Sequence, residues 1–415
     1  MLKNKTKKPF LVGSLLAGFF AVSYFGVSQI TQNVYSDASQ STKVDEKALA
    51  SAEIGTSQKT EPVATHLKTP EPLKGIYMTA CAGSMPSFRD RLAKIADDTE
   101  INSIIIDVKD YSGTISFKSD NPLFKDNGGA GCKISDLREF VEVLHKKNIY
   151  TIARITVFQD PYYSKIHPEL AVKRLSDGAV WKDRKGLSFI DVGAKPYWDY
   201  IVALGEESYK LGFDELNFDY IRFPSDGDMK DIDFTWSRGK NKAVALEEFF
   251  AYLHEKLSPG GAKLSADLFG MTTTNTDDLN IGQVLERTLP YFDYVMPMVY
   301  PSHYPPYFNG WKNPNLQVYG VVNFSMSHAV SRAEATTTPI YLMGESRIGT
   351  STPPRYTKKP ENRLKLRPWL QDFQYGGTYG PTEVRAQIRA TYDAGLTSWI
   401  LWDPANKYTL GALEK

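Results

Sequence analysis

Strand-like and helix-like runs alternate regularly from Leu73 to the C-terminus, and this alternation constrains the fold more than any other feature of the chain. The strand-like runs are short and rich in β-branched and aromatic residues, whereas the stretches between them carry apolar residues at helical spacing. Such an order is typical of parallel sheets, because neighbouring parallel strands need a crossover helix between them. Strand candidates occur at residues 73–80, 103–110, 150–158, 215–223, 263–270, 293–300, 365–373 and 398–404. We therefore predict a single α/β domain, a (β/α)₈ TIM barrel, over residues 73–415.

Helical periodicity is clearest in three of the connecting segments. Each has one apolar face, formed by Leu137, Phe140, Val141 and Leu144, by Leu246, Phe249, Leu253 and Leu257, and by Val384, Ile388 and Tyr392. Gly212 and Gly395 are predicted to end helices, and Thr382 is predicted to cap the start of the last one. An open doubly wound sheet is the structural alternative, but no G-x-G-x-x-G motif follows an early strand. The barrel is therefore the preferred fold.

The first 27 residues have the pattern of a membrane-targeting segment. Lysines at positions 3, 5, 7 and 8 precede an uncharged apolar stretch from Phe10 to Val27. This stretch is just long enough to span a bilayer and no clear A-x-A cleavage site follows it, so we favour an uncleaved anchor over a cleaved signal peptide. Residues 28–72, rich in Ser, Thr, Gln, Lys, Ala and Glu, are predicted to be a disordered linker. Because the lysines stay inside, the barrel is expected to be extracytoplasmic, either anchored to the membrane or secreted after cleavage.

Composition and motifs narrow the possible ligands. The formal net charge is +1 and charged residues make up 23%, so the basic excess of a nucleic-acid-binding protein is missing. The histidines are scattered and the cysteine spacing matches no zinc or redox motif, so we expect neither a metal nor a cofactor. A G-x-S-x-G motif is also absent, which disfavours a serine hydrolase. Cys81 and Cys132 either form one disulfide or remain two buried thiols.

Polar residues alternate with apolar ones inside several strands, and in a barrel this alternation identifies the face that points into the lumen. In residues 215–223 the apolar set is Leu216, Phe218 and Tyr220, which places Asn217 and Asp219 inward. By the same alternation, further polar residues are expected in the lumen or at its mouth: Asp107, Lys109, Arg154, Glu215, Ser265 and Asp267. Such a group is either a salt-bridged plug that fills the lumen or a chemical site.

A pair of these carboxylates suits glycoside hydrolysis, which needs two carboxyl groups that flank one bond. Asp219 lies at the end of the fourth predicted strand and is the candidate nucleophile or base, held ionised by cations such as Arg154 and Arg222. Asp267, on the neighbouring strand, is the preferred proton donor. Asp372 is the second candidate for that role, because the phase of its strand is ambiguous.

Aromatic residues are candidates for stacking against sugar rings. The loop after residues 293–300 contains Tyr300, Tyr304, Tyr307 and Trp311, which form either a sugar platform or a proline-rich lid that packs on itself. Together with the polar residues, the predicted substrate-binding set is Asp107, Lys109, Arg154, Arg222, Tyr300, Tyr304, Trp311, Trp369, Trp402 and Asp403.

Many of these segments resemble, in the same order, a family of glycosyl-hydrolase-like barrels that was formerly a domain of unknown function. The matching segments are IIIDVKDYSG, IYTIARITVFQDP, ELAVKR, WDYIVALGEE, GFDELNFDYIRFPSDG, DYVMPMVYPSHY, LRPWLQDF and WILWDP. The resemblance implies a (β/α)₈ barrel and places the essential acid at Asp219. Residues 335–362 are expected to be an insertion before the seventh barrel strand.

Two functions follow from the sequence. The preferred one is a glycoside hydrolase that acts on an extracytoplasmic or cell-envelope polysaccharide or oligosaccharide through two carboxylates at the barrel mouth. The alternative is a non-catalytic barrel that binds polysaccharide during envelope assembly. A further hydrolase or lyase chemistry on the same barrel remains a third option. The predicted partners are therefore a glycan and, through the N-terminal segment, a membrane.

Overall fold

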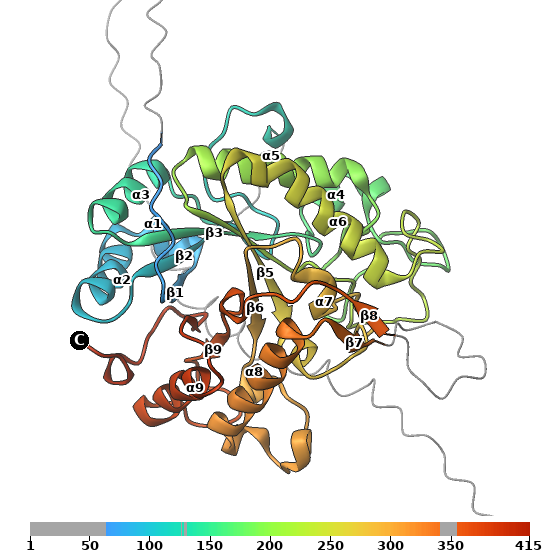
Figure 1. The fold of residues 1–415 in the computed structure, drawn as a ribbon. Helices are drawn as coiled ribbons and strands as arrows, with labels where there is room; N and C mark the ends of the chain where they lie inside the picture. The colour runs from blue at the N-terminus through green and yellow to red at the C-terminus, as the bar shows by residue number, and fades with distance from the viewer. Residues whose placement is uncertain (1–63, 126, 128–130, 341–354) are drawn as a thin grey trace, which may run out of the picture.

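The predicted strands close into a parallel barrel (Figure 1). The structure is a computed structural model that describes residues 64–125, 127, 131–340 and 355–415. Around the barrel the strand order is β1-β10-β9-β6-β5-β4-β3-β2, and β1 pairs with β2 to complete the circle. The barrel strands are β1 (Lys74–Met78), β2 (Ser103–Lys109), β3 (Tyr150–Thr156), β4 (Glu215–Asp219), β5 (Lys263–Phe269), β6 (Tyr294–Met298), β9 (Trp369–Gln371) and β10 (Trp399–Trp402). The (β/α)₈ prediction is confirmed.

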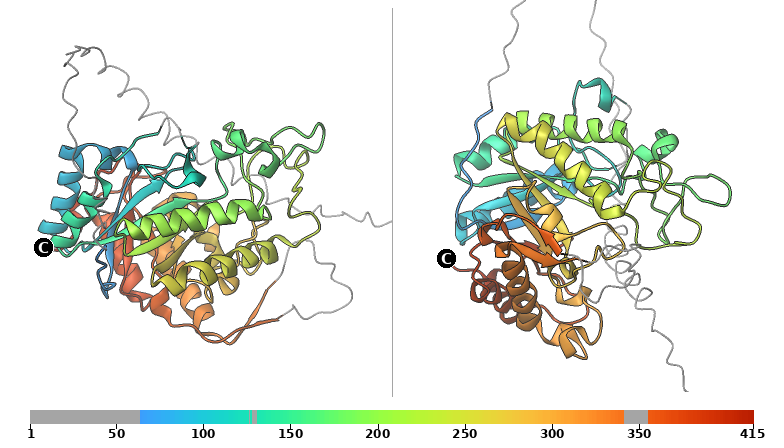
Figure 2. Two further views of the ribbon diagram at one scale, coloured as in Figure 1. Left: turned by 90° about the horizontal axis from the view of Figure 1, so that it is seen from above. Right: turned by 45° about the vertical axis from the view of Figure 1, so that its right-hand side comes forward.

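Helices cover the outside of the barrel, as Figure 2 shows. They are α1 (Ala80–Ser84), α2 (Pro86–Asp98), α3 (Leu137–Lys146), α4 (Tyr163–Ile166), α5 (Lys195–Lys210), α6 (Lys242–Leu257), α7 (Leu285–Thr288), α8 (Val318–Glu334) and α9 (Pro381–Asp393). The long helices pack in neighbouring pairs, α5 with α6 and α8 with α9. The three predicted apolar faces are buried on α3, α6 and α9, except that Tyr392 of α9 is only partly buried.

Two of the three predicted helix ends are confirmed. Gly212 and Gly395 follow α5 and α9 with φ angles of 110° and 83°, a conformation that other residues rarely adopt. The prediction for Thr382 is wrong, because α9 begins at Pro381 and its N-cap is Gly380. Proline is preorganised for the first helical position, and the Glu383 carboxylate accepts a hydrogen bond from the Gly380 N–H at 3.0 Å. The helix therefore starts ahead of Thr382.

Apolar strand residues fall into two separate clusters, which confirms the predicted phases within β4 and β5 and in β2 as far as Asp107. Tyr220 is an exception: it was predicted to point outward with Leu216 and Phe218, but it follows the end of β4 and lines the cavity at the strand ends. The cluster between sheet and helices contains Ile104, Ile106, Leu216, Phe218, Leu264 and Leu268. The cluster inside the lumen contains Tyr77, Ile105, Tyr150, Ile152, Met296, Trp369 and Ile400. Polar strand residues share the inner face with this second cluster.

The insertion before the seventh barrel strand forms a small sheet outside the barrel. Strands β7 (Thr337–Pro339) and β8 (Arg355–Thr357) pair antiparallel and lie at the right-hand edge of Figure 1. Residues 341–354 of the expected insertion lie outside the described residues.

The end of the predicted linker is ordered, which corrects the expectation of disorder up to residue 72. The Leu67 N–H donates to Oδ1 of Asp214 at 2.5 Å, and the His66 ring stacks on Tyr209 at 3.9 Å between centroids. Burial of Leu67 beside the lumen cluster offsets the entropy of ordering this segment.

The predicted membrane segment and residues 28–63 lie outside the described residues. Among the residues that are described, no helix has the length and apolar character needed to cross a bilayer.

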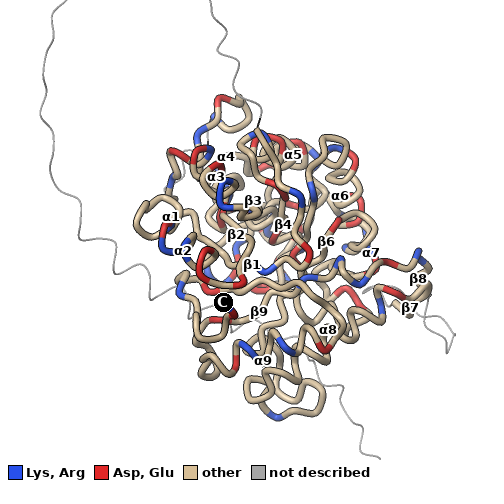
Figure 3. The backbone as a smooth tube through the Cα atoms, turned by 60° about the vertical axis from the view of Figure 1, so that its left-hand side comes forward, with Lys and Arg blue, Asp and Glu red and all other residues tan. Residues whose placement is uncertain are grey.

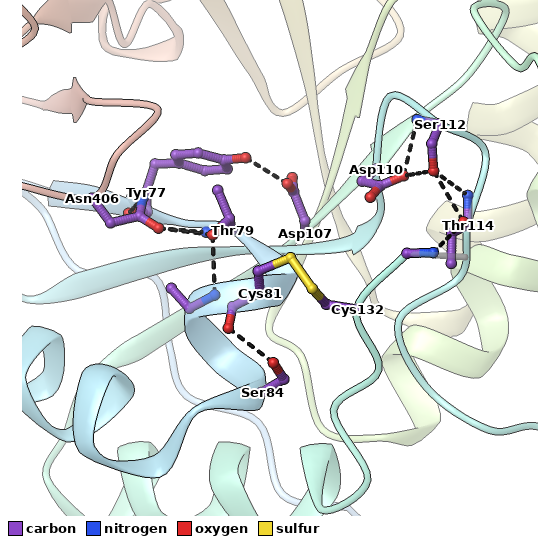
Figure 4. The surroundings of a disulfide bond; sticks show 12 residues. Tyr77, Thr79, Cys81, Ser84, Asp107, Asp110, Ser112, Thr114, Cys132 and Asn406 are labelled. Carbon is purple, nitrogen blue, oxygen red and sulfur yellow. Dashed lines mark hydrogen bonds between the residues drawn. A yellow bond between two sulfur atoms is a disulfide. The ribbon is translucent and has the colours of Figure 1, made fainter. Parts of the chain in front are cut away.

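Cys81 and Cys132 form a disulfide, which decides between the two alternatives left by the sequence. Their Cα atoms are 4.9 Å apart. The bond ties α1 to the loop after β2 and lies close to Tyr77 and Asp107, as Figure 4 shows. It therefore fixes a loop at the end of the barrel where the strands finish.

The loops after β3 and β4 pack on each other at this end of the barrel. Val172, Trp181 and Phe189 form a small apolar cluster with Ile232 and Phe234, and Lys173 pairs through its backbone with Asp233. Charged residues of both signs are interspersed along these loops and along the rest of the tube in Figure 3.

Candidate active site

A cavity of about 160 Å³ lies where the barrel strands end. Its lining consists of Arg154, Asp219, Tyr220, Arg222, Asp267, Phe269, Gln283, Met298, Tyr300, His303, Trp369, Phe373, Trp402 and Pro404. These residues come from β3, β4, β5, β6, β9 and β10 and from the loops that follow them. The carboxyl ends of the strands are the usual location of active sites in this fold.

A wider depression of about 380 Å³ lies on another part of the molecule, next to Glu71, His254 and Asp293. It is open to solvent, and two of its charged residues form ion pairs: Asp293 with Lys263 at 2.8 Å and Lys365 with Glu361 at 3.0 Å. We place the chemistry in the smaller cavity, because that cavity holds buried carboxylates at the strand ends.

Arg154 is the centre of the polar group in the cavity. Its Nη1 donates to Oδ1 of Asp107 at 2.6 Å and its Nη2 donates to Oδ2 of Asp219. Its Nε lies 3.9 Å from Oδ2 of Asp267. Because Asp219 and Asp267 both contact this guanidinium, their nearest oxygens lie within the roughly 10 Å that the two carboxyl groups of a glycosidase span.

The surroundings of Asp267 favour its protonated form. Its Oδ1 accepts hydrogen bonds from Nδ2 of Asn217 at 2.9 Å and from Nε1 of Trp369 at 2.8 Å. Burial, followed by the charge of Asp219, raises the pKa of Asp267 well above its usual range. A buried acid with a raised pKa beside a second carboxylate has the properties of a proton donor.

Asp219 is fixed by the backbone turn that follows it. Its Oδ1 accepts a hydrogen bond from the Tyr220 N–H at 2.5 Å, and Tyr220 has a φ of 52°. A large side chain in the left-handed region is strained, and such strain is concentrated at functional sites. The turn brings the Tyr220 ring to the cavity lining.

Asp107 supports the group without lining the cavity. It accepts a hydrogen bond from the Tyr77 hydroxyl, which points toward it in Figure 4. Burial raises the pKa of Asp107 to about 6, although the Arg154 charge acts in the opposite direction. Asp107, which was predicted to bind substrate, therefore contacts the cavity lining through Arg154.

Aromatic rings form a second part of the lining, the aromatic wall, which contacts the carboxylates through Trp369 and Asp267. The Trp402 ring stacks on Tyr77 with centroids 4.0 Å apart and meets Trp369 edge to face at 5.5 Å. Tyr300 and Phe373 meet edge to face at 5.6 Å in the same lining. Among the predicted substrate-binding aromatics, Tyr300, Trp369 and Trp402 thus line the cavity.

Lys109 does not join this group, contrary to the expectation from strand alternation. The β2–β3 register shifts between Asp107 and Lys109, so the alternation of sides breaks there. The Lys109 ammonium instead forms a fully buried ion pair with Asp160 at 2.9 Å and donates to the Thr156 carbonyl at 2.7 Å.

Asp372 and Asp403 also lie off the cavity lining. Asp372 accepts from the N–H and hydroxyl of Thr409, at 2.8 and 2.5 Å, and so fastens the C-terminal segment. Asp403 accepts from the Ala405 N–H at 2.6 Å and forms a turn. Burial raises their pKa values, to about 7 for Asp372 and about 6 for Asp403, and both carboxyl groups accept hydrogen bonds from the C-terminal segment.

Of the loop aromatics beyond Tyr300, Tyr304 and Trp311 pack on the protein, as expected for a lid that packs on itself. The Tyr304 hydroxyl is 2.9 Å from Oγ of Ser325 on α8. Trp311 meets Phe308 and Phe324 at 6.3 Å. Tyr307 is 68% exposed and is not part of the lining.

Several lining residues were missed by sequence reasoning. Gln283 comes from the loop after β5, where it accepts from the Phe269 N–H at 2.9 Å and donates to the Ile221 carbonyl at 3.2 Å. His303 is another, and burial together with the charge of Lys185 lowers its pKa to about 4. Neither residue lies in a periodic segment, so no pattern in the sequence distinguishes it. Among the described residues no group of three or more His, Cys, Asp or Glu side chains is arranged to hold a metal ion.

The fold and the cavity together define a class of protein. A (β/α)₈ barrel with two lumen carboxylates, a bridging arginine and an aromatic wall at the strand ends is a glycoside-hydrolase-like domain.

Comparison with known families agrees with this class. The chain belongs to the family described as "Putative glycosyl hydrolase domain", whose model matches residues 75–408. Among solved structures, a hypothetical protein from Ruminiclostridium thermocellum ATCC 27405 is 34% identical, over 46% of this chain and 96% of that one, with a TM-score of 0.43.

Two more distant structures share the fold. The PgaB (BpsB) glycoside hydrolase domain from Bordetella bronchiseptica has a TM-score of 0.53 at 13% identity, over 83% of this chain and 99% of that one. The α-L-fucosidase isoenzyme 2 from Paenibacillus thiaminolyticus has a TM-score of 0.52 at 12% identity, over 82% and 48%. A comparison of the sequence with curated proteins found no match.

Proposed function

We propose that this protein is a glycoside hydrolase that cleaves an extracytoplasmic or cell-envelope polysaccharide. The observation that carries the proposal is the placement of Asp219 and Asp267 against one guanidinium, with the pKa of Asp267 raised. Two carboxyl groups with separate protonation states at the end of a barrel are what hydrolysis of a glycosidic bond requires.

In this proposal the two acids have different roles. Asp219 accepts hydrogen bonds from Arg154 and from the Tyr220 N–H, which suits a carboxylate, and it acts as nucleophile or base. Asp267 donates a proton to the leaving oxygen. Its Oδ1 already accepts two hydrogen bonds, so the proton resides on Oδ2, the oxygen nearer Arg154.

The aromatic wall gives the cavity its affinity for sugar. Trp402 and Tyr300 line a space of about 160 Å³, which has room for a small unit such as one sugar ring. Sugars have apolar C–H faces that pack on aromatic rings while their hydroxyl groups reach polar side chains. Arg154, Gln283 and His303 supply such groups in the lining.

We further propose that the barrel works outside the cytoplasm and is delivered there by residues 1–27. The Cys81–Cys132 disulfide supports this, because disulfides persist in oxidising compartments. Protease treatment of intact cells should digest the barrel as completely as treatment of lysed cells. A barrel that is digested only after lysis would count against this location.

The activity is tested by incubating the purified protein with a library of polysaccharides and measuring new reducing ends. We expect release from at least one polysaccharide, and loss of that release in the Asp219→Asn variant. Tight binding of a polysaccharide without any release would instead identify the barrel as a binding module.

A further inference from the structure

Arg222 differs from every other buried cation in the described part of the chain. Five lysine or arginine side chains are buried there, and four form ion pairs with a carboxylate: Lys109 with Asp160, Arg154 with Asp107 and Asp219, Arg332 with Glu286, and Arg367 with Glu215. Arg222 is 7% exposed and has no carboxylate oxygen within ion-pair distance among the described residues. Burial of a charge without a counter-ion is costly unless a ligand supplies one.

The hydrogen bonds of Arg222 leave one edge of its guanidinium without a partner. Nη1 donates to the Phe223 carbonyl at 3.1 Å and to Oγ of Ser225 at 3.3 Å. The described residues offer no acceptor to Nε or Nη2, and neither nitrogen is sealed from solvent, unlike Nε and Nη2 of Arg367. The Nε–Nη2 edge binds a carboxylate or phosphate through two parallel hydrogen bonds.

Arg222 is held rigidly in the cavity lining. Its guanidinium lies over the rings of Phe269 and Tyr220, at 5.0 and 5.5 Å from their centroids, and over Phe189 at 5.8 Å. A guanidinium fixed between rings loses little freedom when an anion binds. The position next to Tyr220 places it beside the catalytic carboxylates.

The nearby acids are already engaged. Asp219 is bound by Arg154, Asp226 lies 3.4 Å from Nε of Arg184, and Asp183 accepts from the N–H groups of Lys185 and Leu187 at 2.9 and 2.8 Å. Burial lowers the pKa of Arg222, and these acids offset that effect only in part.

From this geometry we infer that Arg222 binds an oxyanion on the substrate, so the glycan that enters the cavity is acidic. The oxyanion is a carboxylate, as on a uronic acid, or a phosphate ester on the sugar. This inference rests on the proposed function, because it identifies the substrate class of the same site. It goes beyond that function in predicting that neutral glycans are poor ligands.

The test measures binding separately from cleavage. The Asp267→Asn variant slows hydrolysis, and it replaces a protonated acid with a neutral amide of the same shape. Calorimetry compares its affinity for oligouronides, for the same oligosaccharides after reduction of each carboxyl group to an alcohol, and for phosphate-substituted oligosaccharides. We expect the acidic forms to bind at least about tenfold more tightly than the reduced form. Preference for uronides or for phosphorylated sugars identifies which oxyanion is bound.

Two further variants in this background assign the preference to Arg222. Arg222→Gln should bring the ratio of affinities for acidic and reduced forms close to one. Arg222→Lys should lower this ratio less, because lysine keeps the charge but lacks the Nε–Nη2 edge that donates two parallel hydrogen bonds. Arg389→Gln is the matched control, since it removes the same charge from the exposed surface of α9 and should keep the ratio. Thermal melting shows whether the variants fold.

Each outcome has a defined meaning. Equal binding of acidic and reduced oligosaccharides by the protein with Arg222 intact overturns the inference, even if the Arg222 variants do not fold. If acidic and reduced oligosaccharides bind equally and the protein cleaves a neutral polysaccharide, the proposed function stands and only the acidic substrate class is excluded. A protein that neither binds nor cleaves any of these glycans contradicts both.

Discussion

Trp369 of β9 donates a hydrogen bond from its indole Nε1 to Oδ1 of Asp267 on β5, 2.8 Å away, past the intervening strand β6. The contact joins the aromatic wall of the cavity to its carboxylates. Because one ring both contacts the acid and lines the cavity, the proposed function predicts that the position of a bound sugar and the position of Asp267 are coupled.

Asp219→Asn should abolish turnover and leave the fold intact. The substitution keeps the shape of the side chain but removes the charge, so we expect a loss of activity of at least about a thousandfold. Arg154 keeps Asp107 as a partner, so the melting temperature should change by only a few degrees. Asp136→Asn is the control, because it breaks an arginine ion pair with Arg89 away from the cavity and should keep full activity. Full activity of Asp219→Asn, or its unfolding, would make Asp219 a structural residue.

Asp267→Asn should depend on the leaving group of the substrate. Without the proton donor, cleavage of a glycan should fall by about a hundredfold or more, whereas aryl glycosides with acidic phenols need no proton and should be cleaved nearly as before. The raised pKa of Asp267 also predicts that wild-type activity declines as the pH rises through that pKa, because the donor form is lost. This decline should be absent in the variant. An equal loss for both kinds of substrate would exclude Asp267 as the donor.

Trp402→Ala should change glycan affinity, whereas Trp311→Ala should change stability. Trp402 lines the cavity, so its removal should weaken glycan binding by about 1 kcal/mol, the typical value for an aromatic contact. Trp311 packs between the loop and α8, where it meets Phe324, so its removal should lower the melting temperature and leave affinity unchanged. Titration calorimetry and thermal melting separate the two effects. Weaker binding in Trp311→Ala alone would place the sugar platform on the loop instead.

Asp372→Asn should change the pH dependence of stability and not the activity. Burial raises the pKa of Asp372 in the folded protein to about 7, against about 4 in an unfolded chain. The folded protein therefore binds this proton more tightly, and the free energy of unfolding decreases as the pH rises from about 4 to about 7. In the variant this decrease should be smaller, as thermal melting at pH 5 and pH 8 would show. Loss of hydrolysis in a stable variant would return Asp372 to the list of catalytic residues.

The sequence by itself determined the barrel and much of its polar interior. Side chains alternate between the two faces of a strand whatever the strand packs against, so the alternation alone places Asp107, Arg154, Asp219 and Asp267 in the lumen. Helical periodicity is equally local, so the sequence indicates α3, α6 and α9 and the glycines that follow α5 and α9, Gly212 and Gly395.

Only the tertiary structure decided which of these groups meet. A register shift in β2 turned Lys109 away to Asp160, and the C-terminal segment captured Asp372. The partners of Asp267 and the pairing of Cys81 with Cys132 join segments far apart in the chain. These contacts depend on how loops pack against a completed barrel. No local pattern encodes that packing, because a loop residue contacts whatever segment the closed sheet brings to it.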